Sequence, residues 1–134
     1  MAWRRPRIKL DKDNRAFWTG GREGRLQICR CGDCGVFLHP PGEICSHCTS
    51  ENVAPQAVAG TGTIDSFTIN HQKWAPDMDV PFVIARVALD DAPGVILTTN
   101  IVNGPVETVA IDDPVRVLFE EQNGVWYPLF ERIA

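Results

Sequence analysis

The stretch CGDCGVFLHPPGEICSHC, residues 31–48, holds two C-x2-C pairs separated by ten residues. Two cysteines three positions apart point inward from one tight turn, and Gly35 lets the backbone fold back so that its amides face the sulfurs. Four thiolates at about 2.3 Å complete the tetrahedron of a structural zinc site, which leaves no open position for catalysis. The spacing therefore predicts bound Zn²⁺ that holds the fold together. The predicted ligands are Cys31, Cys34, Cys45 and Cys48.

Other interpretations of the same stretch are less favoured. A tetrahedral four-sulfur site also accepts iron, but Thr49 stands where an electron-transfer iron site usually has glycine. Disulfides are disfavoured because cysteines three apart bond poorly to each other and no secretory signal is recognisable. Cys29 is interpreted as a spare thiol, since using it instead of Cys31 would lengthen the first pair to C-x4-C. His47 is interpreted as a solvated or outer imidazole rather than a ligand.

Length and composition limit the class of protein. A chain of 134 residues forms one domain, or a small metal module with a compact neighbour. No apolar run reaches the roughly 18 residues of a membrane span, and the N-terminal arginines have no apolar stretch behind them, so neither a membrane span nor secretion is expected. Five cysteines, four of them in metal spacing, indicate a reducing cytoplasm.

The charge is unevenly distributed along the chain. The net charge is −4, but residues 1–30 carry nine Lys/Arg against three Asp/Glu, and residues 31–134 carry four against fourteen. The basic segment is either a solvated face or a surface that meets phosphates or an acidic protein. The acidic remainder would be repelled by a nucleic-acid backbone.

The segment before the cysteines predicts little regular structure. Residues 1–12 are expected to be extended and mobile because Pro6 blocks an early helix. A short helix follows, capped by Asp13 or Asn14 and ended at Gly20 by a Gly-Gly pair. Residues 24–28 lead into the first cysteine pair as a turn or strand, residues 36–39 form a strand, and residues 49–55 form a polar linker.

From residue 58 the apolar period changes to two. Glycines open the first strand at residues 60–70, in which Ile64, Ser66 and Thr68 are predicted on one face and Phe67 and Ile69 on the other. Further strands are predicted at residues 82–89, 95–102, 115–119 and 125–130, with a short element at residues 106–111. Five short antiparallel strands after the linker favour a small closed barrel of the OB-fold type. The predicted units are an N-terminal arm with a short helix (1–28), a zinc ribbon (29–54) and an OB-fold (55–134), in a mainly β protein.

The order of these motifs resembles a known family. Phe17-Trp18, Gly24-x-Leu26, the two cysteine pairs around Pro40-Pro41, Gly60-x-Gly62-x-Ile64, Ser66-Phe67-Thr68 and an OB-like tail occur in this order. The combination is similar to the acyl-CoA-associated family of a rubredoxin-like zinc ribbon and an OB-fold, domain of unknown function 35. The resemblance covers nearly the whole chain from about residue 14, although Ser46, Asp112 and the extra Cys29 depart from the family pattern at turns.

The resemblance implies an accessory subunit. Members assemble with thiolase-superfamily proteins or acyl-CoA hydratases, and the catalytic residues of thiolases and of steroid side-chain retro-aldolases belong to the partner. The expected function is therefore to bind a thiolase-like partner, two copies of each chain together, and to help form an acyl-CoA site at the shared interface. Carbon–carbon cleavage or formation on a CoA thioester is the favoured reaction.

Candidate site residues follow from this expectation. No nucleophile motif or paired-carboxylate spacing anchors a mechanism, so no catalytic residue is assigned. The candidate CoA-binding residues are Arg22, Arg25, Arg30 and His71. The candidate partner-interface residues are Phe17, Trp18 and Trp74. Phe17 and Trp18 are equally well interpreted as core residues.

Two other classes of protein fit parts of the sequence. A zinc ribbon with an OB-fold also suits single-stranded nucleic acids when aromatic and basic residues share the barrel face. The barrel segment is acidic, so nucleic acid is not the favoured partner. A small enzyme or an iron-containing electron carrier is the other alternative, and the red colour of an iron site would identify a carrier.

Overall fold

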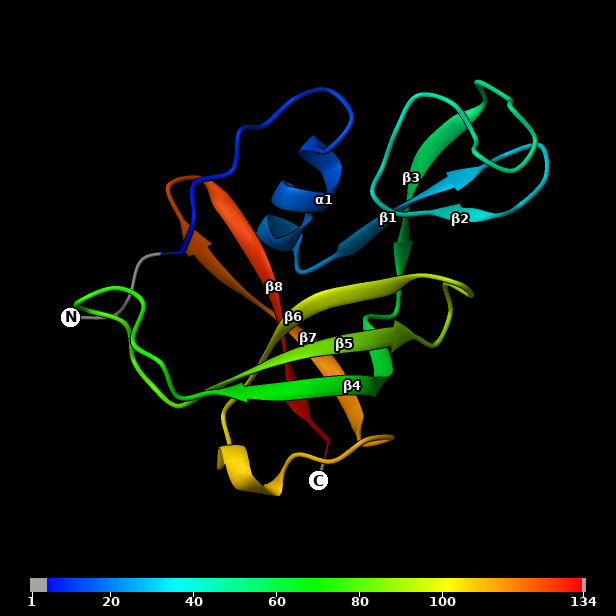
Figure 1. Ribbon diagram of the computed structural model, residues 1–134. Coiled ribbons are helices and arrows are strands. Elements are labelled where there is room, and N and C mark those ends of the chain that lie inside the picture. The colour runs from blue at the N-terminus through cyan, green and yellow to red at the C-terminus, as the bar shows by residue number, and fades with distance from the viewer. Residues whose placement is uncertain (1–4, 134) are drawn as a thin grey trace.

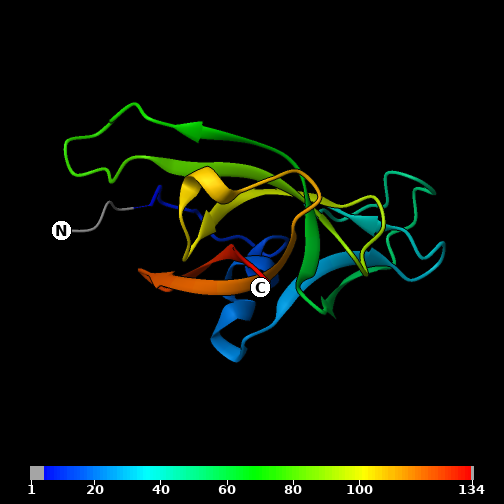
Figure 2. The same ribbon diagram turned by 90° about the horizontal axis from the view of Figure 1, so that it is seen from below.

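The computed structural model describes residues 5–133. Figures 1 and 2 show a mainly β molecule in which a small sheet extends from one side of a barrel. The elements are α1 (Arg15–Thr19), the 3-10 turn η1 (Gly20–Glu23), β1 (Leu26–Cys31), β2 (Phe37–Leu38), β3 (Val53–Val58), β4 (Thr61–Asn70), β5 (Phe82–Leu89), β6 (Ile96–Val102), the 3-10 turn η2 (Val106–Thr108), β7 (Pro114–Gln122) and β8 (Val125–Arg132).

The small sheet has the order β2-β1-β3, and both pairings are antiparallel. The stretch predicted as a linker at residues 49–55 was therefore only partly a linker, because β3 begins at Val53 and pairs with all six residues of β1. Its sequence, VAPQAV, contains little apolar bulk, and Pro55 is typical of a turn. Proline is tolerated there because β3 is an edge strand.

The remaining strands close into a five-stranded barrel, as the sequence predicted, and the structure gives their order as β4-β5-β6-β8-β7. The neighbours are antiparallel except β6 and β8, which pair in parallel through Ile101 with Phe130 and Val102 with Glu131. The short element predicted at residues 106–111 is the 3-10 turn η2. Strand β8 ends beside β6 and so completes the barrel.

A β-bulge in β4 corrects the predicted faces of the first barrel strand. The register shifts between Ile64 and Ser66, so Asp65 is an extra residue opposite β5. An inserted residue moves every later side chain to the other face. Phe67 and Ile69 consequently pack on the same core as Ile64. The strict alternation predicted from sequence had placed these residues on opposite faces.

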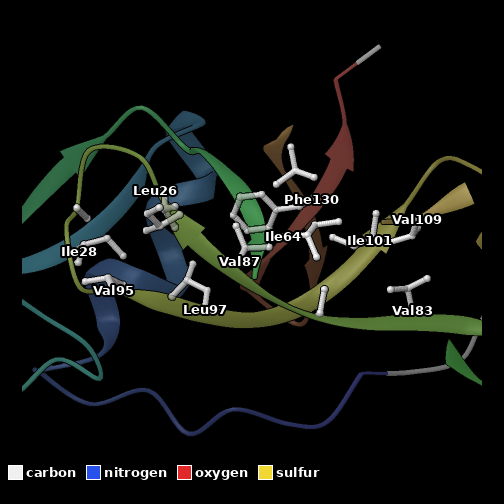
Figure 3. Close-up of a cluster of buried hydrophobic side chains, with 14 of the residues drawn as sticks. Leu26, Ile28, Ile64, Val83, Val87, Val95, Leu97, Ile101, Val109 and Phe130 are labelled. Atoms are coloured by element: carbon white, nitrogen blue, oxygen red, sulfur yellow. The ribbon is translucent and has the colours of Figure 1, made fainter. Parts of the chain in front are cut away.

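One hydrophobic core joins the small sheet to the barrel (Figure 3). Leu26 and Ile28 of β1 lie among barrel residues that include Val87, Leu97 and Phe130, and all of them are buried. The other face of β1 carries Cys29 and Cys31 into a second cluster with Leu38 and Cys45. Strand β1 therefore connects the cysteine-rich end of the molecule rigidly to the barrel, since side chains alternate across a strand.

Residues 1–12 were predicted to be extended and mobile; residues 1–4 lie outside the part that the structure describes, and the segment before α1, residues 5–14, starts against the barrel. Arg5 donates through Nε to Glu120 Oε2 at 3.0 Å and through Nη1 to Asn100 Oδ1 at 2.7 Å. The hydroxyl of Tyr127 donates to the carbonyl of Pro6. We call residues 5–14 the N-terminal arm. These contacts attach its start to β6, β7 and β8, partners that lie about a hundred positions away in the chain.

The short helix and its end follow the prediction only in part. Asn14 is the N-cap residue of α1 but makes no side-chain capping hydrogen bond. The Gly-Gly pair does not end the helical segment, because η1 continues from Gly20 to Glu23 as a 3-10 turn. Gly24, with φ of 71°, ends it in the left-handed conformation that glycine adopts without strain.

Candidate metal centre and docking surfaces

The four predicted ligands converge at the end of the small sheet. The Sγ atoms of Cys31, Cys34, Cys45 and Cys48 all lie within 4.8 Å of one another. The Cys31–Cys48 and Cys34–Cys45 sulfur pairs are each 3.6 Å apart. A tetrahedral ion with bonds of about 2.3 Å requires sulfurs about 3.8 Å apart. The four cysteines are therefore positioned to bind a metal ion such as Zn²⁺.

Both cysteine turns have the same backbone geometry. Gly35 N donates to Cys31 O at 3.0 Å, and Thr49 N donates to Cys45 O at 2.9 Å. Gly35 and Thr49 have φ of 79° and 64°. The second turn thus holds a β-branched residue in the region that normally requires glycine, which costs energy that the surrounding site must supply.

Backbone amides point at the sulfurs and change their acidity. The N–H of Cys34 lowers the pKa of Cys31 to about 6, and the N–H of Cys48 lowers the pKa of Cys45. Although the N–H of Ser50 lowers it, burial and the neighbouring sulfurs raise the pKa of Cys48 to about 12. Because zinc ligands must be deprotonated, a bound cation displaces the thiol protons into solvent, and the amide N–H groups favour this deprotonation at Cys31 and Cys45.

Asp33 joins the two cysteine turns and was not recognised from the sequence. Its carboxylate accepts hydrogen bonds from Ser50 Oγ and, at 3.2 Å, from Asn52 Nδ2. These two bonds lower the pKa of Asp33. Gly32 N also donates to Asn52 O at 2.7 Å. The segment after the second cysteine pair is therefore fastened to the first pair, a contact that spacing alone does not reveal.

The two neighbouring candidates stay outside the sulfur cluster. Cys29 is buried, and its Sγ lies 3.9 Å from the carbonyl of Gly42 rather than among the four sulfurs. His47 contributes its backbone N–H, which donates to Cys45 Sγ at 3.3 Å. Both placements agree with the interpretation of Cys29 as a spare thiol and of His47 as an outer residue.

The candidate CoA-binding residues are distributed over separate elements. Arg22 lies in η1 with its guanidinium 4.9 Å from the centre of the Trp126 ring, and Arg25 is exposed just before β1. Arg30 is used within the small sheet, where Nε donates to Gly35 O at 3.0 Å. His71 is exposed in the β4–β5 loop, which projects from the barrel on the side away from the small sheet (Figures 1 and 2). Of these four candidates, Arg22 and Arg25 are the two that are both exposed and close to each other in the chain.

The candidate interface residues have different environments. Phe17 is 7% exposed and belongs to the main core, so it is an intramolecular residue in this chain. Trp18 is partly buried and meets the ring of Tyr127 edge-on, with 5.6 Å between ring centres. Trp74 is 73% exposed, and its Nε1 donates to Asn70 Oδ1 at 3.0 Å. Trp74 is therefore held in place while its ring faces solvent.

Within residues 5–133, none of the helices is long and apolar enough to cross a membrane.

A four-thiolate ribbon followed by a closed five-stranded barrel defines a zinc-ribbon and OB-fold protein. The chain belongs to the ChsH2 family: residues 18–54 match the rubredoxin-like zinc ribbon domain of ChsH2, and residues 55–120 match its C-terminal OB-fold domain. The resemblance seen in the sequence is thereby confirmed, as is the zinc ribbon.

Two curated relatives support this assignment. A probable enoyl-CoA hydratase alpha subunit from Thermomonospora curvata is 35% identical over 83% of this chain and 34% of the relative. The 3-oxo-4,17-pregnadiene-20-carboxyl-CoA hydratase alpha subunit from Mycobacterium tuberculosis is 33% identical over 84% of this chain and 35% of the relative. The chain spans about a third of the length of these relatives.

Two solved structures have the same fold. One, described as the Ltp2-ChsH2(DUF35) aldolase, has a TM-score of 0.83 and 31% identity, and the match covers 94% of this chain and 98% of that chain. The other, a DUF35 protein of unknown function from Sulfolobus solfataricus, has a TM-score of 0.59 and 18% identity over 87% of this chain and 82% of that chain. The second likeness concerns the fold alone.

Proposed function

We propose that this chain is a non-catalytic accessory subunit that binds a thiolase-superfamily partner and helps to form the partner's acyl-CoA site. The observation that carries the proposal is the likeness to the Ltp2-ChsH2(DUF35) aldolase, which extends over nearly the full length of both chains. That structure carries two protein names, Ltp2 and ChsH2, and is described as an aldolase, which agrees with a partner subunit and with carbon–carbon cleavage or formation. The names of the curated relatives also point to CoA thioesters.

The division of labour follows from the site. A metal ion held by four thiolates has no open coordination position, so the zinc ribbon supports the fold and does not activate a substrate. The catalytic side chains accordingly belong to the partner in this proposal. Arg22 and Arg25 contribute exposed positive charge for the phosphates of CoA through charge-assisted hydrogen bonds.

The charges of the barrel argue against nucleic acid as the ligand. Three of its arginines already face carboxylates within the barrel: Arg86 with Asp65 at 3.8 Å, Arg116 with Glu131 at 2.8 Å and Arg132 with Asp113 at 2.9 Å. Binding to a single strand requires a positively charged groove. Paired arginines on an acidic barrel do not provide one.

The proposal is tested by purifying the tagged chain from its native host, followed by mass spectrometry of co-eluting proteins and metal analysis of the same fraction. We expect a thiolase-like partner and about one zinc per chain. Recovery of an acyl-CoA hydratase would instead assign the chain to a hydratase complex. Zinc with bound nucleic acid and no protein partner would contradict the proposal.

Trp74 provides the mutational test of the interface. A fixed, exposed tryptophan is a common anchor of an interface, and truncation of such an anchor costs about 2 kcal/mol or more. Trp74→Ala is therefore expected to weaken the complex at least about 30-fold while zinc content stays unchanged. Surface plasmon resonance with the purified partner measures the change. The control is Ile111→Ala, which removes another exposed apolar side chain, 59% accessible, in the loop before β7. Unchanged affinity of the Trp74 variant would place the interface elsewhere.

A further inference from the structure

A cavity lies where β6 and β8 diverge. These strands pair only through Ile101 with Phe130 and Val102 with Glu131, although β6 begins at Ile96 and β8 begins at Val125. The N-terminal arm and α1 lie on this side of the barrel (Figure 1). Between them and the two strands is a cavity of about 310 Å³, within the range of small-molecule sites.

The walls of this cavity are mostly apolar and aromatic. Leu97, Tyr127 and Leu129 are 3%, 8% and 5% exposed, and Trp18 contributes a fourth wall residue. Leu129 and Tyr127 pair with Leu118 and Glu120 of β7, which puts all four on one face of the β7–β8 pair. Glu120 on that face accepts a hydrogen bond from Arg5, so the face is the one that the arm covers. The cavity therefore lies between the N-terminal arm with α1 on one side and the barrel strands β6 and β8 on the other.

Arg5 forms the polar end of the cavity. With Asn100 it lines both this cavity and a neighbouring one of about 260 Å³. Its Nη1 donates to Asn100 Oδ1 at 2.7 Å and its Nε donates to Glu120 Oε2 at 3.0 Å. The side chain is 15% exposed. Arg5 therefore borders both cavities and is held there by two polar partners.

We propose that the cavity between the N-terminal arm, α1, β6 and β8 binds the acyl group of a CoA thioester, with Arg5 at its inner limit. The inference rests on the proposed function and adds a site to it. The apolar walls suit an uncharged hydrocarbon chain better than the phosphates of CoA, since burying charge against apolar groups is costly. A volume of about 310 Å³ has room for about ten groups the size of a water molecule. A linear acyl group of medium length fits this space.

The experiment compares CoA, butanoyl-CoA and octanoyl-CoA as ligands of the zinc-loaded full chain by isothermal titration calorimetry. Each methylene buried in the cavity is worth about 0.8 kcal/mol, so affinity is expected to rise about fourfold per methylene until the cavity is filled. Free octanoate serves as a further probe, which separates binding of the acyl group from binding of the CoA moiety.

Two matched variants locate the site. Thr98 is an exposed residue that lines the cavity, and Thr68 is an exposed residue of β4 paired with Ile84. Thr98→Phe narrows the cavity and is expected to weaken octanoyl-CoA binding at least about tenfold. This is the loss expected when about two methylenes of the acyl chain are no longer buried. Its affinity for CoA is expected to stay within about twofold, a change smaller than that of one buried methylene. Thr68→Phe makes the same substitution outside the cavity and is expected to leave both affinities within this range.

Several outcomes would overturn the inference. These are an affinity that does not depend on acyl length, an unaltered octanoyl-CoA affinity of the Thr98 variant, or equal losses in both variants. If Thr98→Phe abolishes co-purification of the partner but leaves acyl-CoA binding intact, the cavity receives a partner side chain and not a ligand. Co-purification of the unaltered chain is measured separately, so failure of the acyl site is distinguishable from failure of the accessory-subunit proposal.

Discussion

Replacing Cys45 with serine is expected to abolish zinc binding and unfold the ribbon. Cys45 is fully buried and its sulfur accepts two backbone N–H bonds besides facing Cys34. Structural zinc contributes about 10–16 kcal/mol of binding free energy that is also folding free energy. A serine hydroxyl is a poor replacement for a thiolate at such a site. Metal analysis should therefore give far less than one zinc per chain, and amide exchange should show loss of protection in β1–β3.

Cys29→Ser is the matched control for this experiment. It removes another buried cysteine sulfur, from β1 and two residues before the predicted ligand Cys31, but from outside the four-sulfur cluster. We expect this variant to retain about one zinc per chain. Full zinc content in the Cys45 variant, or zinc loss in the Cys29 variant, would show that the four-cysteine assignment is wrong.

Phe130→Ala is expected to cause the second large loss, in the barrel. Phe130 is fully buried at the point where β8 pairs with β6 and β7, and it contacts the core that also contains Leu26 and Ile28 of β1. Truncation of a buried phenylalanine costs about 3–5 kcal/mol because a cavity remains. This is a large part of the total stability of a domain, which is about 5–15 kcal/mol. Urea denaturation followed by circular dichroism measures the loss.

The control for the barrel is Ile84→Ala, at an exposed position of β5. It should change the free energy of unfolding by less than about 1 kcal/mol. Because β1 shares the core, we also expect Phe130→Ala to lower the stability of the ribbon in the same transition. If the ribbon and barrel unfolded in two separate transitions, with the ribbon unaffected, the single shared core would be contradicted.

The sequence was sufficient for features that depend on local spacing. Two C-x2-C pairs determine a four-sulfur site because the turns that bring the sulfurs together are only a few residues long. Apolar alternation with glycine, proline and Asn-Gly turns located the barrel strands to within a few residues, since period two arises within each strand. The prediction was wrong for part of residues 49–55, where polar and small residues concealed the start of β3 at Val53.

The candidate site was less predictable than the fold. In the sequence, Arg30 was as good a candidate for binding CoA as Arg22. In the structure its guanidinium donates hydrogen bonds to Gly35 O and Gln56 Oε1. Phe17 was balanced between core and interface, and packing placed it in the core. Asp33 had no distinguishing signal, because its partners Ser50 and Asn52 follow the second cysteine pair. Which polar group is already satisfied depends on neighbours that no local pattern identifies.

The sequence by itself determined the zinc ribbon, the five-stranded barrel and their order, because these follow from turns and periodicities a few residues long. The tertiary structure alone decided the bulge at Asp65, the contact of the N-terminal arm with Tyr127, and the cavity beside Arg5. Each of these results from contacts between segments distant in the chain, and register, burial and empty space are properties of how such segments pack together.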